Sequence, residues 1–235
     1  MRCEKYRSFF TQPFLMGPNS IRLLDELLHT YPLSLPEDGL ILDLGCGSGL
    51  TSLFAARETG AKVCACDLWI SEEENRRRFA QWGMQERITP AQQDAACLQF
   101  EKESFDAMIS VDAYHYFAGK EGFFSGHILP LIKKGGVVLI AVPGIKDAYD
   151  GQSEALLSPW LGDEAHMFRS ASFWRRMLQD DRHAAQVVTW EMDGFDLPWQ
   201  EWFETKNPYA LGDLEHYETI IKPYTAFVGM MVRKK

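Results

Sequence analysis

Residues 40–56, which read LILDLGCGSGLTSLFAA, decide how the rest of the chain is interpreted. The stretch begins with an apolar run containing Asp43, passes through three glycines at alternate positions, and closes on apolar residues at helical spacing. This pattern predicts a strand, a tight turn and a helix. Because glycine lacks a Cβ, the backbone can turn sharply and approach a ligand, and the first N–H groups of the helix have no partner within it. The turn is therefore a candidate binding site for a polar ligand.

The spacing of the glycines narrows the choice of ligand. The dinucleotide fingerprint G-x-G-x-x-G/A fails in both registers, because its last position falls on Leu50 or on Ser52. The observed pattern, acid-x-Gly-x-Gly-x-Gly, resembles motif I of the class I S-adenosylmethionine-dependent methyltransferases. The resemblance implies that S-adenosylmethionine contacts the turn through Asp43, Leu44, Gly45, Cys46 and Gly47.

Three further predicted strands are also followed by acids. They are 61–67, 87–92 and 105–111, with Asp67, Asp94 and Asp112 at or just after their ends. Ligands in open α/β sheets bind at the carboxyl ends of the strands, so these acids should meet at one site. An acid at the position of Asp67 can accept hydrogen bonds from ribose hydroxyls, although capping of the next helix is an alternative.

The resemblance covers roughly residues 40–143 and implies roles for the remaining strand ends. In the resembled family an acid after the third strand accepts from the adenine amino group, with the adjacent backbone N–H facing the ring. Asp94 and Ala95 stand at that place. Leu68 and Asp112 complete the implied cofactor site.

The coarse pattern of the chain alternates strands with helices. A first helix is expected to start after a cap at Asn19 or Ser20 and to end before Pro32. Further helices are expected over 72–82, 121–132 and 173–179, and later strands over 137–142, 186–192 and 224–233. The resemblance implies a doubly wound, Rossmann-like α/β fold. Its seven strands would take the order 3-2-1-4-5-7-6, with the last strand antiparallel.

The length of 235 residues and the 46% hydrophobic content favour one domain with a single sizeable core. We divide it into an N-terminal helical arm (1–39), a cofactor-binding core (40–143) and a C-terminal half (144–235). Two Pro/Gly-marked inserts, 144–170 and 195–223, are expected to form a lid on the substrate side. The aromatic stretch 9–18 is either a packing extension or a flap over the ligand.

Composition excludes several classes of partner. A net charge of −9 and a pI near 5.2 leave no electrostatic footprint for nucleic acid. No apolar run approaches the length of about 20 residues that a membrane helix needs, and no secretory signal is evident. Five cysteines without a C-x-x-C pair predict neither disulfides nor a metal site. A cytoplasmic protein is expected, and its oligomeric state is left open.

Methyl transfer from a sulfonium is an in-line displacement that needs neither a metal nor a protein nucleophile. If the acceptor must lose a proton, His115 has a suitable ordinary pKa, with Tyr114 or Tyr116 to position it. A packed loop histidine is the alternative, and His166 is a second candidate base. The tryptophans of the C-terminal half are either core or a substrate wall, such as an aromatic cage for an amine or a surface for an apolar ring.

The segment after the fourth strand reads Asp112-Ala113-Tyr114-His115, without the Asn/Asp-Pro-Pro-Tyr run of many nucleobase and glutamine methyltransferases. Together with the acidic charge, this favours a small-molecule acceptor over a macromolecule. Two other hypotheses stay open: a regulatory protein that binds the cofactor without catalysis, and a nucleotide-dependent oxidoreductase, which the failed glycine registers disfavour.

Overall fold

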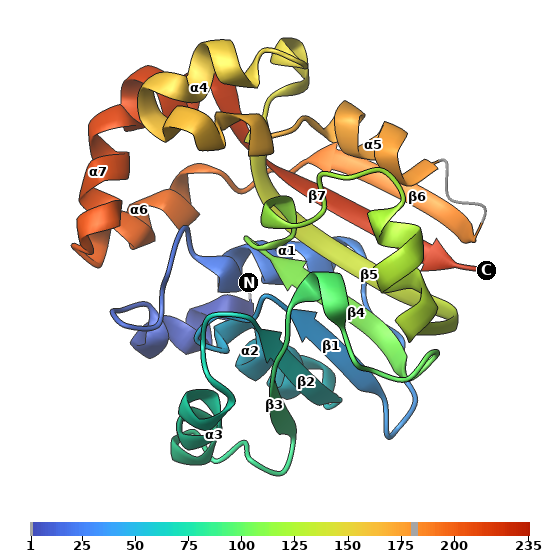
Figure 1. Cartoon of the computed structure of the whole chain (residues 1–235). Coiled ribbons are helices and arrows are strands. Elements are labelled where there is room, and N and C mark those ends of the chain that lie inside the picture. Colours follow the sequence, from blue (N-terminus) through green and yellow to red (C-terminus); the bar gives the residue numbers. More distant parts are fainter. Residues whose placement is uncertain (1, 180–182) are drawn as a thin grey trace.

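A single seven-stranded sheet forms the centre of the computed structural model, which describes residues 2–179 and 183–235 (Figure 1). The strand order is β3-β2-β1-β4-β5-β7-β6, with β1 to β5 parallel and β7 antiparallel to both of its neighbours. The strands are β1 (Leu40–Leu44), β2 (Lys62–Asp67), β3 (Ile88–Gln92), β4 (Phe105–Val111), β5 (Ile132–Ile145), β6 (Ala184–Glu191) and β7 (Thr225–Lys234). This topology confirms the order that the family resemblance implied.

Alternating side chains of the central strands enter two different cores, because successive residues of a strand point to opposite faces of the sheet. In β1, Ile41 joins one core and Leu42 the other; in β4, Ile109 and Met108 divide in the same way. Both faces are apolar because helices cover both, as is usual for parallel sheets.

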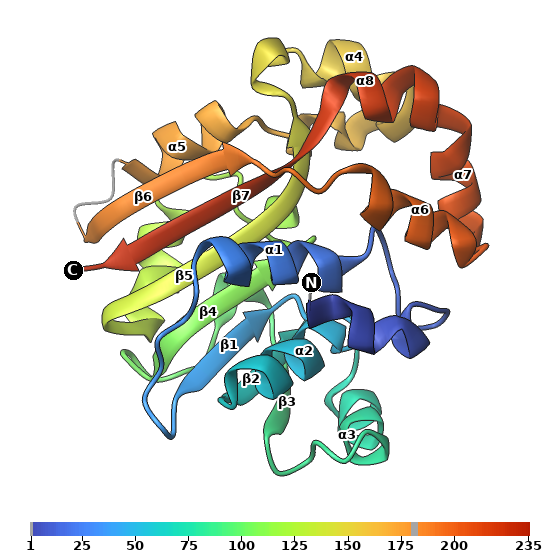
Figure 2. The same ribbon diagram turned by 180° about the vertical axis from the view of Figure 1, so that it is seen from behind.

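The helices are α1 (Ser20–Thr30), α2 (Leu50–Thr59), α3 (Glu72–Gln81), α4 (Ser153–Leu161), α5 (Ala171–Gln179), α6 (Asp196–Glu204), α7 (Pro208–His216) and α8 (Lys222–Tyr224). Helices α1 and α2 pack into the first core and α5 into the second (Figure 2). The start of α1 is capped by Asn19 Oδ1, which accepts from the Ile21 amide, and α3 is capped by Ser71. None of the described helices is long and apolar enough to cross a membrane.

The prediction of a helix over 121–132 is wrong. Instead of a helix over 121–132, the chain forms a short π-helical turn (Phe124–Ile128) and a 3-10 turn (Leu129–Leu131), and β5 then begins at Ile132. Pro130 lacks the N–H that would continue an α-helix, and Gly122 and Gly126 lower the helical propensity of this stretch.

The inserts of the C-terminal half gather at one end of the molecule as α4, α6, α7 and a 3-10 segment, η7 (Gly162–Met167) (Figure 1). Helix α6 is fastened to α1 by a buried ion pair, in which the Arg22 guanidinium donates to both carboxylate oxygens of Glu201 at 2.6 Å. Asn19 Nδ2 donates to the same carboxylate at 2.7 Å. Residues far apart in sequence therefore fix α6 to the N-terminal arm. We call α4, η7, α6 and α7 the lid segments, after the role expected from the sequence.

Candidate active site

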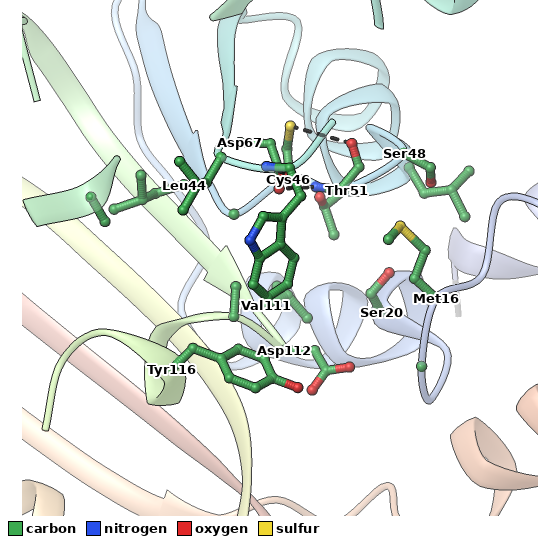
Figure 3. Close-up of a pocket in the computed structure, with 18 of the residues that line it drawn as sticks. Met16, Ser20, Leu44, Cys46, Ser48, Thr51, Asp67, Val111, Asp112 and Tyr116 are labelled. Carbon is green, nitrogen blue, oxygen red and sulfur yellow. Dashed lines mark hydrogen bonds between the residues drawn. The ribbon is translucent and has the colours of Figure 1, made fainter. Parts of the chain in front are cut away.

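A cavity of about 400 Å³ opens at the carboxyl ends of β1, β2 and β4 (Figure 3). Its wall is built from five segments: the glycine turn after β1, the loop after β2, the residues after β3, the residues after β4, and the N-terminal arm around Met16. Cavities of this size, at the strand ends of an α/β sheet, are where such folds bind small ligands.

The glycine turn forms one part of the wall, and its backbone approaches the neighbouring loops closely. Gly45 and Gly47 have φ angles of +76° and +52°, in the left-handed region that side chains disfavour. A Cβ on Gly45 would also overlap the Cβ of Ala113, which follows β4. The amides of Gly45 and Cys46 donate to the Cys66 carbonyl, at 2.8 and 3.1 Å, and tie the turn to the end of β2.

Asp67 organises the loops on both sides of the cavity. Its Oδ2 accepts from the Gly47 amide at 2.8 Å, and its Oδ1 accepts from the amides of Trp69 and Ile70 at 2.8 and 2.9 Å. A carboxylate oxygen accepts up to two hydrogen bonds, so Oδ2 has room for a ligand hydroxyl. Since Ser71 caps α3, Asp67 is not the cap of that helix.

Asp94 and Ala95 lie together at the cavity beside Gln93. Asp94 Oδ1 accepts from the Ala96 amide at 2.8 Å, which starts a single 3-10 turn. Leu68, from the loop after β2, faces the same space and is about half exposed.

Asp43 lies outside the cavity wall, although the resemblance implied that it contacts the cofactor. It is fully buried behind the turn, where its Oδ2 accepts from the hydroxyls of Thr51 and Ser52, both at 2.6 Å. Its Oδ1 has no hydrogen-bond partner among the described residues. Burial raises the pKa of Asp43 to about 6, because the charged form is poorly solvated there. In this structure Asp43 shapes the turn from behind by holding the start of α2.

Asp112 lies at the opposite wall, next to the N-terminal arm. Its φ angle of +57° turns the chain out of β4, and its amide donates to the Ala141 carbonyl at 2.8 Å. The Asp112 carboxylate lies against Gly17, where a Cβ would overlap Oδ2. Burial, and then the charge of Asp213, raise the pKa of Asp112 to about 7.

Tyr114 and His115, expected at the reaction centre, do not line this cavity. The 3-10 turn Tyr114–Tyr116 has three residues per turn, so these three side chains point in three directions. Tyr114 packs against Trp174 in the core, and His115 is buried between Tyr116 and Phe168, where desolvation lowers its pKa to about 3. Of the three, Tyr116 alone faces the cavity, and burial raises its pKa.

The arm contributes wall residues that the sequence did not single out. Phe14, Met16, Gly17 and Pro18 line the cavity, and Ser48 Oγ donates to the Phe14 carbonyl at 2.6 Å, which attaches the arm to the glycine turn. The irregular, aromatic composition of 9–18 was the only sign in the sequence that the arm could cover the ligand. It indicated a flap or a packing extension, but not which of its residues would line the cavity. The exposed Trp69 lines the mouth of the cavity as well.

A family model described as "Methyltransferase domain" matches residues 41–136, the segment that carries the glycine turn and the acids after β2, β3 and β4. Over these residues the chain is similar to class I S-adenosylmethionine-dependent methyltransferases. The chain is 31% identical over 108 residues to a 2-methyl-6-phytyl-1,4-hydroquinone methyltransferase of Synechocystis, a match that covers 46% of this chain and 33% of that protein. The chain spans about a third of the length of the first curated relatives that it matches.

Solved structures share the fold of this chain. A geranyl diphosphate C-methyltransferase from Streptomyces coelicolor, in complex with Mg²⁺, geranyl diphosphate and S-adenosyl-L-homocysteine, superposes with a TM-score of 0.70 at 18% identity, covering 91% of this chain and 79% of that one. The [4+2]-cyclase SpnF superposes with a TM-score of 0.69 at 15% identity, covering 91% and 80%. Because a cyclase has the same fold, the fold alone does not determine the reaction.

Proposed function

We propose that this chain binds S-adenosylmethionine in the cavity at the strand ends and transfers its methyl group to a small-molecule acceptor. The observation that carries the proposal is the joint position of the glycine turn, Asp67 and Asp94 around one cavity, inside a segment that matches the methyltransferase model.

The residues present fit the cofactor. The backbone of Gly45 and Gly47 forms a cradle without side chains, suited to close approach by the methionyl part. Asp67 Oδ2 retains capacity for a ribose hydroxyl, and Asp94 with Ala95 provides an acceptor and a backbone amide for the adenine edge. Leu44, Cys46 and Leu68 supply apolar wall on either side of these polar groups.

When bound, S-adenosylmethionine supplies an electrophilic methyl group on a positively charged sulfur. The protein must align an acceptor atom with that methyl and keep water out, and alignment of this kind contributes about 7–11 kcal/mol in favourable cases. The arm, through Met16 and Gly17, and the loop residues Trp69 and Tyr116 surround the open side of the cavity, and so are placed to orient the acceptor.

A small molecule is the acceptor class that we favour. The cavity volume of about 400 Å³ suits a cofactor with one modest partner, and the net charge of −9 opposes nucleic acid. The similarity to a quinol methyltransferase supports the same choice. Two alternatives remain, a macromolecular acceptor and cofactor binding without catalysis. The labelling experiment described next distinguishes both from a small-molecule acceptor.

Two measurements test the proposal. Calorimetry should show binding of S-adenosylhomocysteine and none of NADH or NADPH. Incubation of the protein with a cell extract and methyl-labelled S-adenosylmethionine, followed by separation by size, should place label in the metabolite fraction. Label confined to protein, RNA or lipid would overturn the acceptor class. Tight S-adenosylhomocysteine binding without transfer to any fraction would support the regulatory alternative.

A further inference from the structure

The charged residues that line the cavity all have the same sign. Within the described part of the chain its wall holds Asp67, Asp94 and Asp112, but no lysine, arginine or histidine. Asp67 and Asp94 each accept hydrogen bonds from backbone amides at the cofactor side and keep the remaining acceptor capacity that the proposed function assigns to the cofactor. Asp112 is different, because no described residue forms an ion pair or a side-chain hydrogen bond with its carboxylate. In Figure 3 the Asp112 carboxylate and the Tyr116 hydroxyl lie near each other at the wall of the cavity.

Two lid carboxylates add to this negative field. Asp213 of α7 accepts from the indole N–H groups of Trp160 and Trp202, at 2.9 and 2.8 Å, which fix its position without neutralising its charge. Burial is the main cause of the raised pKa values of Asp112 and Tyr116. The charge of Asp213 adds to the shift of Asp112, and the charges of Asp112, Glu164 and Asp213 add to that of Tyr116. Burial raises the pKa of Asp213, whereas the hydrogen bonds from Trp202 and Trp160 and the neighbouring His216 act in the opposite direction. Asp112 follows β4, Glu164 lies in η7 and Asp213 lies in α7. Because these acids come from three separate elements, no local sequence feature explains why they lie close together.

A row of aromatic rings joins the lid acids to the cavity mouth. The ring centroids of Trp160 and Phe168 are 5.4 Å apart, those of Phe168 and His115 5.9 Å, those of His115 and Tyr116 4.1 Å, and those of Tyr116 and Trp69 6.0 Å. Within this row His115 Nδ1 is buried without a hydrogen-bond partner among the described residues. Carboxylates combined with aromatic faces attract cations and disfavour anions.

We propose that the acceptor is an amine, which reaches the cavity as its ammonium cation and is bound by the Asp112 carboxylate against the Tyr116 side of the aromatic row. The inference rests on the proposed function. Asp112 takes one proton from the ammonium, which leaves a neutral amine with a free lone pair; the proton then passes to solvent. A phosphate or carboxylate group on the acceptor is disfavoured next to Asp112, because it would meet a like charge there and no cation of the wall.

The charge of the methylated product tests this inference, and the test works while the acceptor is still unidentified. A metabolite extract is incubated with the full chain and methyl-labelled S-adenosylmethionine, and phenylboronate resin then removes the ribose-bearing cofactor. The remaining label is divided at pH 7 between cation exchanger, anion exchanger and flow-through. Label on the cation exchanger is the expected result, and most label in either other fraction overturns the amine assignment while leaving methyl transfer intact. No label in any fraction, despite binding of S-adenosylhomocysteine, overturns the proposed function as well.

Asp112→Asn separates acceptor binding from cofactor binding. Asparagine tolerates the positive φ at this position and removes only the charge. We expect the rate of label transfer to the cationic fraction to fall at least tenfold, whereas the dissociation constant of S-adenosylhomocysteine changes less than threefold. Asp163→Asn is the matched control, since Asp163 is an exposed lid acid away from the cavity wall, and it should change neither quantity. A large loss of S-adenosylhomocysteine affinity in Asp112→Asn would assign this carboxylate to the cofactor and overturn the inference.

Discussion

The two sides of the cavity are built by different kinds of contact. On the cofactor side, carboxylates bind backbone amides of short loops: Asp67 accepts from the Gly47, Trp69 and Ile70 amides, and Asp94 from that of Ala96. On the lid side, side chains bind side chains from distant segments, as in Arg22 with Glu201 and Trp160 with Asp213. Backbone amides are present whatever the sequence, so the first kind of site needs only a few motif residues. The second kind depends on the whole fold, and it can therefore vary from one acceptor to another.

The largest expected effect is at Gly45. Gly45→Ala places a Cβ against that of Ala113 and keeps a left-handed backbone, so we expect unfolding free energy to fall by about 3 kcal/mol or more. Affinity for S-adenosylhomocysteine should also fall at least tenfold. Gly60→Ala is the matched control, because Gly60 has nearly the same φ of +75° and open space around it. If urea denaturation shows the same loss of unfolding free energy in both variants, the contact between position 45 and Ala113 does not contribute to the destabilisation.

The buried acid behind the turn makes folding stability depend on pH. Asp43 ionises near its ordinary pKa of 3.8 when unfolded and near about 6 when folded, so its contribution to stability is present below pH 4 and is lost as the pH rises through 6. In Asp43→Asn this dependence is absent. The unfolding free energy of the wild type relative to the variant should therefore fall by about 2 kcal/mol between about pH 4 and pH 7. Parallel denaturation curves across this range would show that Asp43 is not protonated in the fold.

Asp67→Ala tests the cofactor side directly. The variant loses the acceptor for three backbone amides and for the proposed ribose hydroxyl, so binding of S-adenosylhomocysteine should weaken by about 1–3 kcal/mol. Asp67→Asn keeps one carbonyl acceptor and should fall between the wild type and the alanine variant by calorimetry. Unchanged affinity in both variants would remove Asp67 from the site.

The smallest effect is expected at the lid. Trp202→Phe removes one of the two indole donors to Asp213 and keeps most of the ring packing, so the unfolding free energy should fall by about 1–2 kcal/mol. Binding of S-adenosylhomocysteine should stay within twofold of the wild type, because Trp202 does not line the cavity. A large loss of cofactor affinity would mean that the two sides of the cavity are not separable.

The difference between the cofactor side and the lid side of the cavity also explains which features could be predicted from the sequence. The strand order followed from the resemblance, and the approach of Asp67, Asp94 and Asp112 to one edge followed from the geometry of parallel strands. The directions of Tyr114, His115 and Tyr116 did not follow, because they depend on a single 3-10 turn after β4. The pairing of Asp213 with Trp160 and Trp202 links α4 and α6 to α7, and no local periodicity encodes such a contact.

Hydrogen exchange with and without S-adenosylhomocysteine tests the central claim most directly, because it shows where the cofactor lies on the chain. We predict slower exchange of backbone amides in 44–50, 67–70 and 93–97 and in the arm around residues 14–18, with little change in α7. Protection confined to the lid helices, or absent from the glycine turn at saturating ligand, would contradict the assignment of the cofactor to the strand ends.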